Sequence, residues 1–196
     1  MTASRSGSTA KRTGTPPATP PRRSWGGLVA AIAHPEPTRA LVVGLGTGSS
    51  AGWLADVPTI ERVDVVELEP AILEVARVCA PVNRNVLERD DVRVIIADGR
   101  EIVRTIRDRY DVVFSEPSHP YRAGIASLYT REFYESVAER LTERGIFVQW
   151  VQAYEIDAQT LRTIYATLRS VFVHVDSWIG NPCDLLLVCI GGADRV

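Results

Sequence analysis

The sequence has few of the side chains on which nucleophilic and metal-dependent sites most often rely. Its single lysine, Lys11, is close to the amino terminus, so the rest of the chain offers no lysine for Schiff-base chemistry. Cysteine and histidine occur three times each, without C-x-x-C spacing, and we expect no metal site. Three cysteines cannot all pair, which favours reduced thiols in or near the core of a cytoplasmic protein. These residues are Cys79, Cys183, Cys189, His34, His119 and His174.

Long apolar runs are also missing. No run approaches the roughly 20 residues of a membrane-spanning helix, so we expect no membrane span. Acids are absent from residues 1–35, which carry five of the 22 basic residues; residues 36–196 carry the other 17 against all 24 acids, a net charge of −7 (17 − 24). An acidic body argues against nucleic acid as a partner and weakly favours a cationic substrate, although a solvated acidic surface explains it equally well.

Residues 1–24 are rich in Ser, Thr, Pro, Gly and Arg, and we expect a disordered basic tail followed by one folded domain over 25–196. The stretch RRSWGGLVAAIAHP (22–35) has two interpretations. Its paired arginines, short apolar run and A-x-A pattern imitate a bacterial export signal. We favour a short helix packed on the fold, because cleavage after Ala33 would leave the first strand almost at the new terminus.

From residue 40 the chain alternates strand-like apolar runs with segments of helical periodicity. Most of the strand candidates are too continuously apolar for a sheet that is buried on one face only. The alternation predicts an α/β fold with a Rossmann-like doubly wound sheet of about seven strands and a C-terminal antiparallel hairpin. The expected strands are 40–44, 63–68, 92–98, 111–115, 145–151, 171–176 and 184–190. The expected helices lie within 46–57 and at about 70–80, 100–108, 130–141 and 157–169.

Ligands of doubly wound sheets bind outside the carboxyl ends of the strands. The first strand runs into G-x-G-x-G (Gly44, Gly46 and Gly48), which lets backbone N–H groups approach a ligand at the start of a helix. Glu67 ends the second strand 19 residues later (67 − 48), where an acid can accept hydrogen bonds from both ribose hydroxyls. Asp98 follows the third strand and can cap a helix, bind an adenine amino group, or do both. The glycine spacing favours a ligand of the S-adenosylmethionine type over NAD.

Six motifs in order resemble the spermidine synthase family, especially its spermidine-synthase-like branch. They are HPEPTRALVVGLGTG, VDVVELEP, DDVRVIIADGRE, YDVVFSEPSHP, SLYTREFYE and GIFVQW. The resemblance covers about residues 34–190 and implies the fold of the S-adenosylmethionine-dependent methyltransferases. It also implies that decarboxylated S-adenosylmethionine donates an aminopropyl group to putrescine or a related polyamine, leaving methylthioadenosine. By the same resemblance Glu67 binds the ribose, and Asp98 with Gly99 lies beside the adenine.

The reactive side departs from the pattern of that family. Thr47 stands where the family's first loop has an Asp near the donor's amino group. Glu116 and His119, our candidate catalytic residues, stand where the family has two aspartates, of which the first helps to deprotonate the attacking amine. We expect this chain to lack the family's amino-terminal β-domain, which helps to close the site.

Four further side chains are candidates for contact with the acceptor. The fifth expected strand, 145–151, ends near Trp150 and Gln152, which could line the acceptor pocket. The aromatic residues of SLYTREFYE more readily pack a helix against the sheet; they are Tyr129, Phe133 and Tyr134. Tyr129 nevertheless lies close enough to the active-site loop to contact an acceptor. We interpret His174, inside an apolar strand, as a hydrogen-bonded core residue. The four candidates are Ser118, Tyr121, Tyr129 and Gln152.

Three functions remain open from the sequence. The first is aminopropyl transfer to a small amine or polyamine, for which Glu116 can accept the proton of an amine that is mostly protonated at neutral pH, although its extra methylene moves the oxygens by about 1.5 Å. The second is methyl transfer from S-adenosylmethionine on the same fold, and the third is a nucleoside-binding module whose catalysis is degraded. We favour the first; a homodimer is one assembly that the sequence allows.

Overall fold

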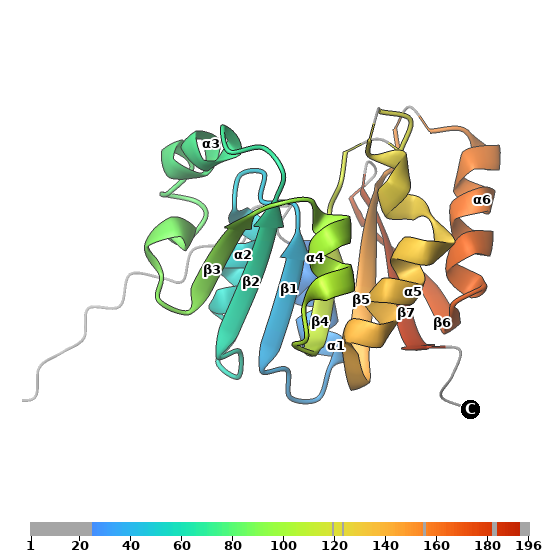
Figure 1. Ribbon diagram of the computed structural model, residues 1–196, viewed down its shortest axis with the longest axis horizontal. Helices are drawn as coiled ribbons and strands as arrows, with labels where there is room; N and C mark the ends of the chain where they lie inside the picture. The colour runs from blue at the N-terminus through green and yellow to red at the C-terminus, as the bar shows by residue number, and fades with distance from the viewer. Residues whose placement is uncertain (1–24, 119, 123, 155, 182–183, 193–196) are drawn as a thin grey trace, which may run out of the picture.

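A seven-stranded sheet in the order β3-β2-β1-β4-β5-β7-β6 forms the centre of the molecule, with helices on both faces (Figure 1). This computed structural model describes residues 25–118, 120–122, 124–154, 156–181 and 184–192. Strands β1 to β5 run parallel, and β7 is antiparallel to both β5 and β6. The predicted fold, with its antiparallel hairpin at the carboxyl end, is confirmed. The tail expected over residues 1–24 lies outside the described residues.

The elements follow the predicted alternation closely. The strands are β1 Arg39–Val43, β2 Arg62–Glu67, β3 Val92–Ile96, β4 Tyr110–Ser115, β5 Leu141–Gln152, β6 Phe172–Asn181 and β7 Asp184–Gly192. The α-helices are α1 Trp25–Ala33, α2 Ser49–Ala55, α3 Ile72–Val78, α4 Gly99–Thr105, α5 Arg131–Arg140 and α6 Ala158–Arg169. Two short 3₁₀ helices, η2 Val86–Glu88 and η3 Ala126–Tyr129, complete the described part of the chain.

The sheet is buried between two apolar layers. Leu41 and Val43 of β1 point into the layer under α4, α5 and α6, whereas the alternate residues Ala40 and Val42 point into the layer under α1 and α2. Burial of each of these Leu and Val side chains contributes about 1.5–3 kcal/mol. Segment 25–33 forms α1, the helix favoured from the sequence. Gly26 lets it approach the sheet, because a Cβ there would lie 2.3 Å from the Phe114 ring.

The carboxyl-terminal hairpin is longer than predicted. Strand β6 is the edge of the sheet, and it runs on to Asn181 although Trp178 and Ile179 are exposed. Polar and apolar residues both suit an exposed edge strand, so hydropathy did not mark its end. His174 of β6 is exposed, and our interpretation of it as a core residue was wrong for the same reason. Of the cysteines, Cys189 is buried, Cys79 is half-buried, both are free, and Cys183 lies outside the described residues.

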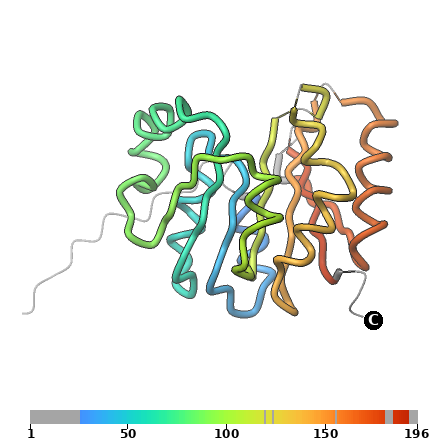
Figure 2. Tube along the Cα trace, in the orientation of Figure 1, coloured from blue at the N-terminus to red at the C-terminus, as the bar shows by residue number. Residues whose placement is uncertain are grey.

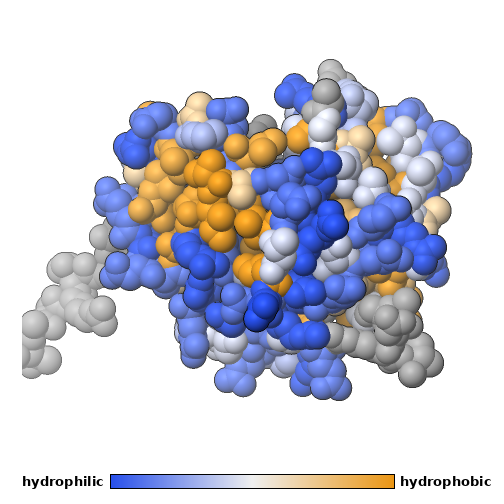
Figure 3. All heavy atoms as spheres, viewed as in Figure 1, coloured by the Kyte–Doolittle hydropathy of each residue, from blue (hydrophilic) through white to orange (hydrophobic). Residues whose placement is uncertain are grey.

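The topology brings several loops to one edge of the sheet. The chain leaves β1, β2, β3 and β4 at the upper edge in Figure 2, which is the carboxyl edge of these parallel strands. Below that edge, Figure 3 shows apolar residues over β2 and β3, and Leu68, directly after β2, is 65% exposed. None of the helices in the described ranges is long and apolar enough to cross a membrane.

Candidate functional site

The glycine loop turns the chain sharply from β1 into α2. Gly44 has φ +103°, and a Cβ at this position would lie 3.3 Å from the carbonyl oxygen of Glu116. Gly48 has φ +78°, and a Cβ there would lie 2.6 Å from Cγ1 of Val86. Left-handed backbone and close neighbours together require glycine at both positions. Gly46, with φ +51° and open space beside it, presents bare backbone to the cavity described below.

Asn83 clamps this loop from the side. Its amide nitrogen donates to the carbonyl oxygens of Thr47 at 2.8 Å and Ala76 at 2.7 Å, and its side-chain oxygen accepts from the N–H of Val86 at 3.3 Å. Asn83 is fully buried, so these bonds are shielded from water and hold the loop against α3. Asn83 was not predicted as a site residue, because it lies 36 positions from Thr47 and no local pattern signals the contact.

Glu67 lies at the end of β2 and its carboxylate faces the glycine loop. One oxygen accepts a hydrogen bond from the N–H of Leu45 at 2.9 Å, and the other accepts from the N–H of Glu69 at 2.9 Å. The two bonds fix the carboxylate between the first and second strand ends. Since each carboxylate oxygen can accept two hydrogen bonds, both retain capacity for a ribose hydroxyl. This geometry suits the predicted ribose contact.

Asp98 lies at the end of the next loop and caps α4. Its Oδ1 accepts from the N–H of Arg100 at 2.9 Å, and the Arg100 guanidinium forms an ion pair with the same carboxylate. This guanidinium is the main cause that holds the pKa of Asp98 below its ordinary value. Gly99 allows α4 to start close to β1, because a Cβ there would lie 2.8 Å from Val43. Asp98 is therefore a cap, and an adenine amino group would have to share it with Arg100.

A cavity of about 260 Å³ joins the glycine loop to the end of β4. Glu116 forms part of its wall, and Glu116 Oε2 accepts a hydrogen bond from the Ser50 hydroxyl at 2.8 Å. The Glu116 N–H donates to the carbonyl oxygen of Val43 at 3.0 Å, so both ends of this residue are held at the switch point between β1 and β4. The cavity is lined by Gly46, Thr47, Ser49, Ser50, Val75, Glu116 and Trp150.

Trp150 of β5 gives this cavity an aromatic wall, and neighbouring residues hold it in place. Its indole N–H donates to Asp184 Oδ1 at 3.1 Å. Behind it, the buried Gln149 donates to the carbonyl oxygens of Trp150 at 3.1 Å and Ser115 at 3.4 Å. A rigid aromatic ring and a carboxylate on one cavity suit a ligand with an alkyl chain and a cationic nitrogen.

None of the other candidates within the described residues lines this cavity. Tyr129 is buried, its hydroxyl donates to the carbonyl oxygen of Ser118 at 3.3 Å, and burial raises its pKa well above the ordinary value. It packs in the core and ties down the loop after β4. Tyr121 is 61% exposed, and Gln152 is half-buried at the end of β5. His119 lies outside the described residues. Their roles stay predictions.

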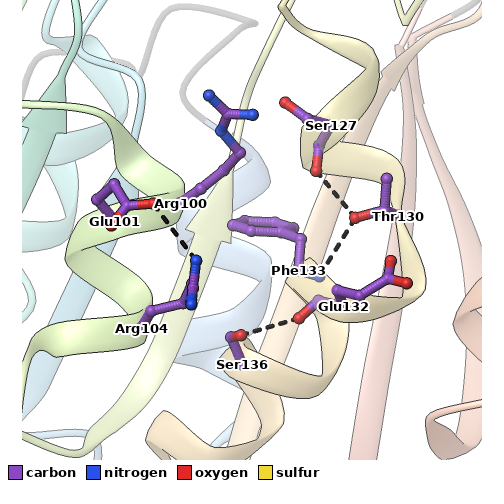
Figure 4. Close-up of a pocket in the computed structure, with 8 residues that line it drawn as sticks. All are labelled: Arg100, Glu101, Arg104, Ser127, Thr130, Glu132, Phe133 and Ser136. Carbon is purple, nitrogen blue, oxygen red and sulfur yellow. Dashed lines mark hydrogen bonds and ion pairs between the residues drawn. The ribbon is translucent and has the colours of Figure 1, made fainter.

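A larger hollow of about 500 Å³ lies between α4 and α5 (Figure 4). Its hydroxyl groups are used locally: Ser127 donates to the Gly124 carbonyl at 2.6 Å, and Ser136 to the Glu132 carbonyl at 2.8 Å. Phe133 lies between the two helices in Figure 4. Arg100, at the rim, links this hollow to the Asp98 cap. Because these polar groups already bond within the protein, we interpret the hollow as a groove between two helices and not as the candidate site.

Comparison with known proteins gives consistent results. The family model described as "Spermine/spermidine synthase domain" matches residues 27–180. A polyamine aminopropyltransferase of Clostridium botulinum (strain Eklund 17B / Type B) is 29% identical over 141 residues, which is 71% of this chain and 49% of the relative. The chain thus spans about half the length of the curated relatives that it matches.

Solved structures show the same fold. A spermidine synthase in complex with the transition-state analogue AdoDATO superimposes with a TM-score of 0.76 at 20% identity, covering 86% of this chain and 59% of that one. Human methyltransferase-like protein 13 in complex with SAH has a TM-score of 0.69 at 24% identity, covering 89% of this chain and 82% of that one.

Proposed function

Since the chain belongs to the spermine/spermidine synthase domain family, we propose that it transfers an aminopropyl group from decarboxylated S-adenosylmethionine to a small amine or polyamine. Glu116 carries the proposal. Its carboxylate lies on a cavity that also contains the glycine loop and an aromatic wall. A proton acceptor and a nucleoside-binding loop on one cavity are what this reaction needs.

The donor would bind along three strand ends. In the proposed complex, backbone groups of the glycine loop lie against the nucleoside, Glu67 accepts hydrogen bonds from the ribose hydroxyls, and Asp98 accepts from the adenine amino group. The Glu67 contacts support this arrangement, because both carboxylate oxygens are already oriented by backbone N–H groups. The sulfonium end of the donor then points toward the cavity that contains Glu116.

The proposed chemical step is a displacement at carbon. The amine nitrogen attacks the aminopropyl carbon bonded to the sulfonium sulfur, a C–N bond forms, the bond between sulfur and that carbon breaks, and the electron pair stays on sulfur in neutral methylthioadenosine. The acceptor amine must lose a proton, since an amine with a pKa near that of lysine is mostly protonated at pH 7. Glu116 accepts this proton, and the cavity walls align the two reactants.

Methyl transfer from intact S-adenosylmethionine is the second candidate, and one observation favours it. The cavity presents hydroxyl groups rather than a carboxylate at Thr47 and Ser49, whose side-chain oxygens lie 3.1 Å apart. Hydroxyl donors suit the carboxylate that the decarboxylated donor lacks, whereas a carboxylate at Thr47 would repel it.

Calorimetric titration with three ligands separates the candidates. Tighter binding of decarboxylated S-adenosylmethionine than of S-adenosylmethionine supports aminopropyl transfer, and the opposite order supports methyl transfer. Methylthioadenosine serves as the control for the nucleoside part alone. If none of the three binds, the nucleoside pocket itself is wrong.

A further inference from the structure

Ser50 makes a contact with Glu116 that neither the glycine motif nor the loop after β4 predicts. The two residues are 66 positions apart, and the hydroxyl of Ser50 donates to Oε2 of Glu116 at 2.8 Å. Ser50 lies in the first turn of α2 and is only 3% exposed, so water does not compete strongly for the bond. A hydrogen bond to a charged group in such a place is stronger than a neutral one.

The backbone of Glu116 is already fixed, so contacts to its side chain decide where the carboxylate lies. Its N–H donates to the carbonyl oxygen of Val43, and the glycine loop packs closely on its backbone, because a Cβ on Gly44 would lie 3.3 Å from the carbonyl oxygen of Glu116. A Glu side chain has one more rotatable bond than Asp, and immobilising a free Glu costs up to about 2 kcal/mol of rotamer entropy. The bond from Ser50 restricts that freedom in the folded protein.

We propose that Ser50 is a positioning residue that holds the Glu116 carboxylate against the cavity wall, ready to accept the proton of the attacking amine. This inference rests on the proposed function. Ser50 and Glu116 act as a pair: the longer acid reaches the cavity, and the hydroxyl limits where its oxygens lie. An Asp at 116, shorter by about 1.5 Å, would leave Ser50 without this partner.

Steady-state kinetics of single and paired variants tests the pair. We expect Ser50→Ala to lower kcat for aminopropyl transfer about tenfold, which corresponds to about 1.4 kcal/mol, with KM for the donor little changed. Ser50→Thr keeps a hydroxyl and should recover most of the rate. Ser136→Ala removes a helix hydroxyl that donates to the Glu132 carbonyl oxygen and does not line the cavity, and it is the control.

The double variant gives the sharper readout. Since Glu116→Asp already breaks the contact, adding Ser50→Ala to it should lower kcat by less than twofold, so the two changes are not additive. Additive effects, or a Ser50→Ala rate equal to that of Ser136→Ala, would overturn the inference while leaving aminopropyl transfer intact.

Crystal structures of the parent and of Ser50→Ala test the contact without any activity. We expect the Ser50 hydroxyl within hydrogen-bond distance of the Glu116 carboxylate in the parent, and a different or multiple side-chain conformation of Glu116 in the variant. A parent protein in which the two groups are apart, or a variant in which Glu116 is unmoved, contradicts the inference. An inactive parent that shows the contact and its loss contradicts only the proposed function.

Discussion

Replacement of Glu67 by Gln should weaken nucleoside binding in a way that the geometry makes specific. Each oxygen of Glu67 faces a backbone N–H, at Leu45 and at Glu69. An amide in the same place must turn its NH₂ group toward one of these donors, so one hydrogen bond becomes a contact between two donors. The variant therefore disturbs the loop as well as removing the charge that attracts the ribose hydroxyls.

The size of the effect follows from these contacts. A hydrogen bond to a charged group contributes about 1.5–3 kcal/mol, and two ribose hydroxyls would each make one. Glu67 is half-buried, so solvent screens part of this contribution. We expect a total loss of about 1.5–3 kcal/mol, which is a roughly 10- to 100-fold weaker Kd for methylthioadenosine.

Calorimetric titration of the parent, Glu67→Gln and Glu69→Gln measures this directly. Glu69→Gln makes the same change of charge in the same loop on an exposed residue, and its affinity should stay within about twofold of the parent's. Thermal unfolding of each variant shows whether it is folded. If Glu67→Gln is folded and binds methylthioadenosine as tightly as the parent does, the ribose assignment is refuted.

Three further predictions concern the surrounding structure. Gly44→Ala should lower the free energy of unfolding by about 1–3 kcal/mol in chemical denaturation, because φ is +103°. Burial alone would raise the pKa of Asp111, but hydrogen bonds, among them those from Thr38, outweigh burial and hold the pKa below its ordinary value. The stability that Asp111 contributes is therefore complete above about pH 4 and is lost as the pH falls further. Asp111→Asn should accordingly flatten the loss of stability below pH 4 in acid unfolding, and an unchanged curve would contradict the assignment. Arg100→Ala frees the carboxylate of Asp98, and methylthioadenosine should bind about two- to fivefold tighter; weaker binding would mean that the arginine helps to hold the ligand.

The parts of the fold that the sequence predicted are those set by local pattern. Continuous apolar runs marked the buried strands, and the glycine motif with Glu67 lies within one short β-α-β unit. Edge strand β6 was predicted too short, because an edge strand need not be apolar on both faces.

The contacts that complete the site depend on the register of distant strands. Ser50 meets Glu116 because β1 and β4 are paired with Val43 opposite Ser115, and this pairing places the ends of both strands together. Asn83, in the turn after α3, reaches Thr47 in the glycine loop. Serine and asparagine are common in turns, so their residue types alone do not single out these two positions.

Product analysis tests the central claim most directly. The full chain is incubated with decarboxylated S-adenosylmethionine and a panel of diamines and polyamines, and mass spectrometry measures both products. The account predicts methylthioadenosine and an aminopropylated amine in equal amounts, with a rate at least about 100-fold lower for Glu116→Gln, as expected on loss of a general base. Absence of both products with every amine, or a Glu116→Gln variant as active as the parent, would contradict it.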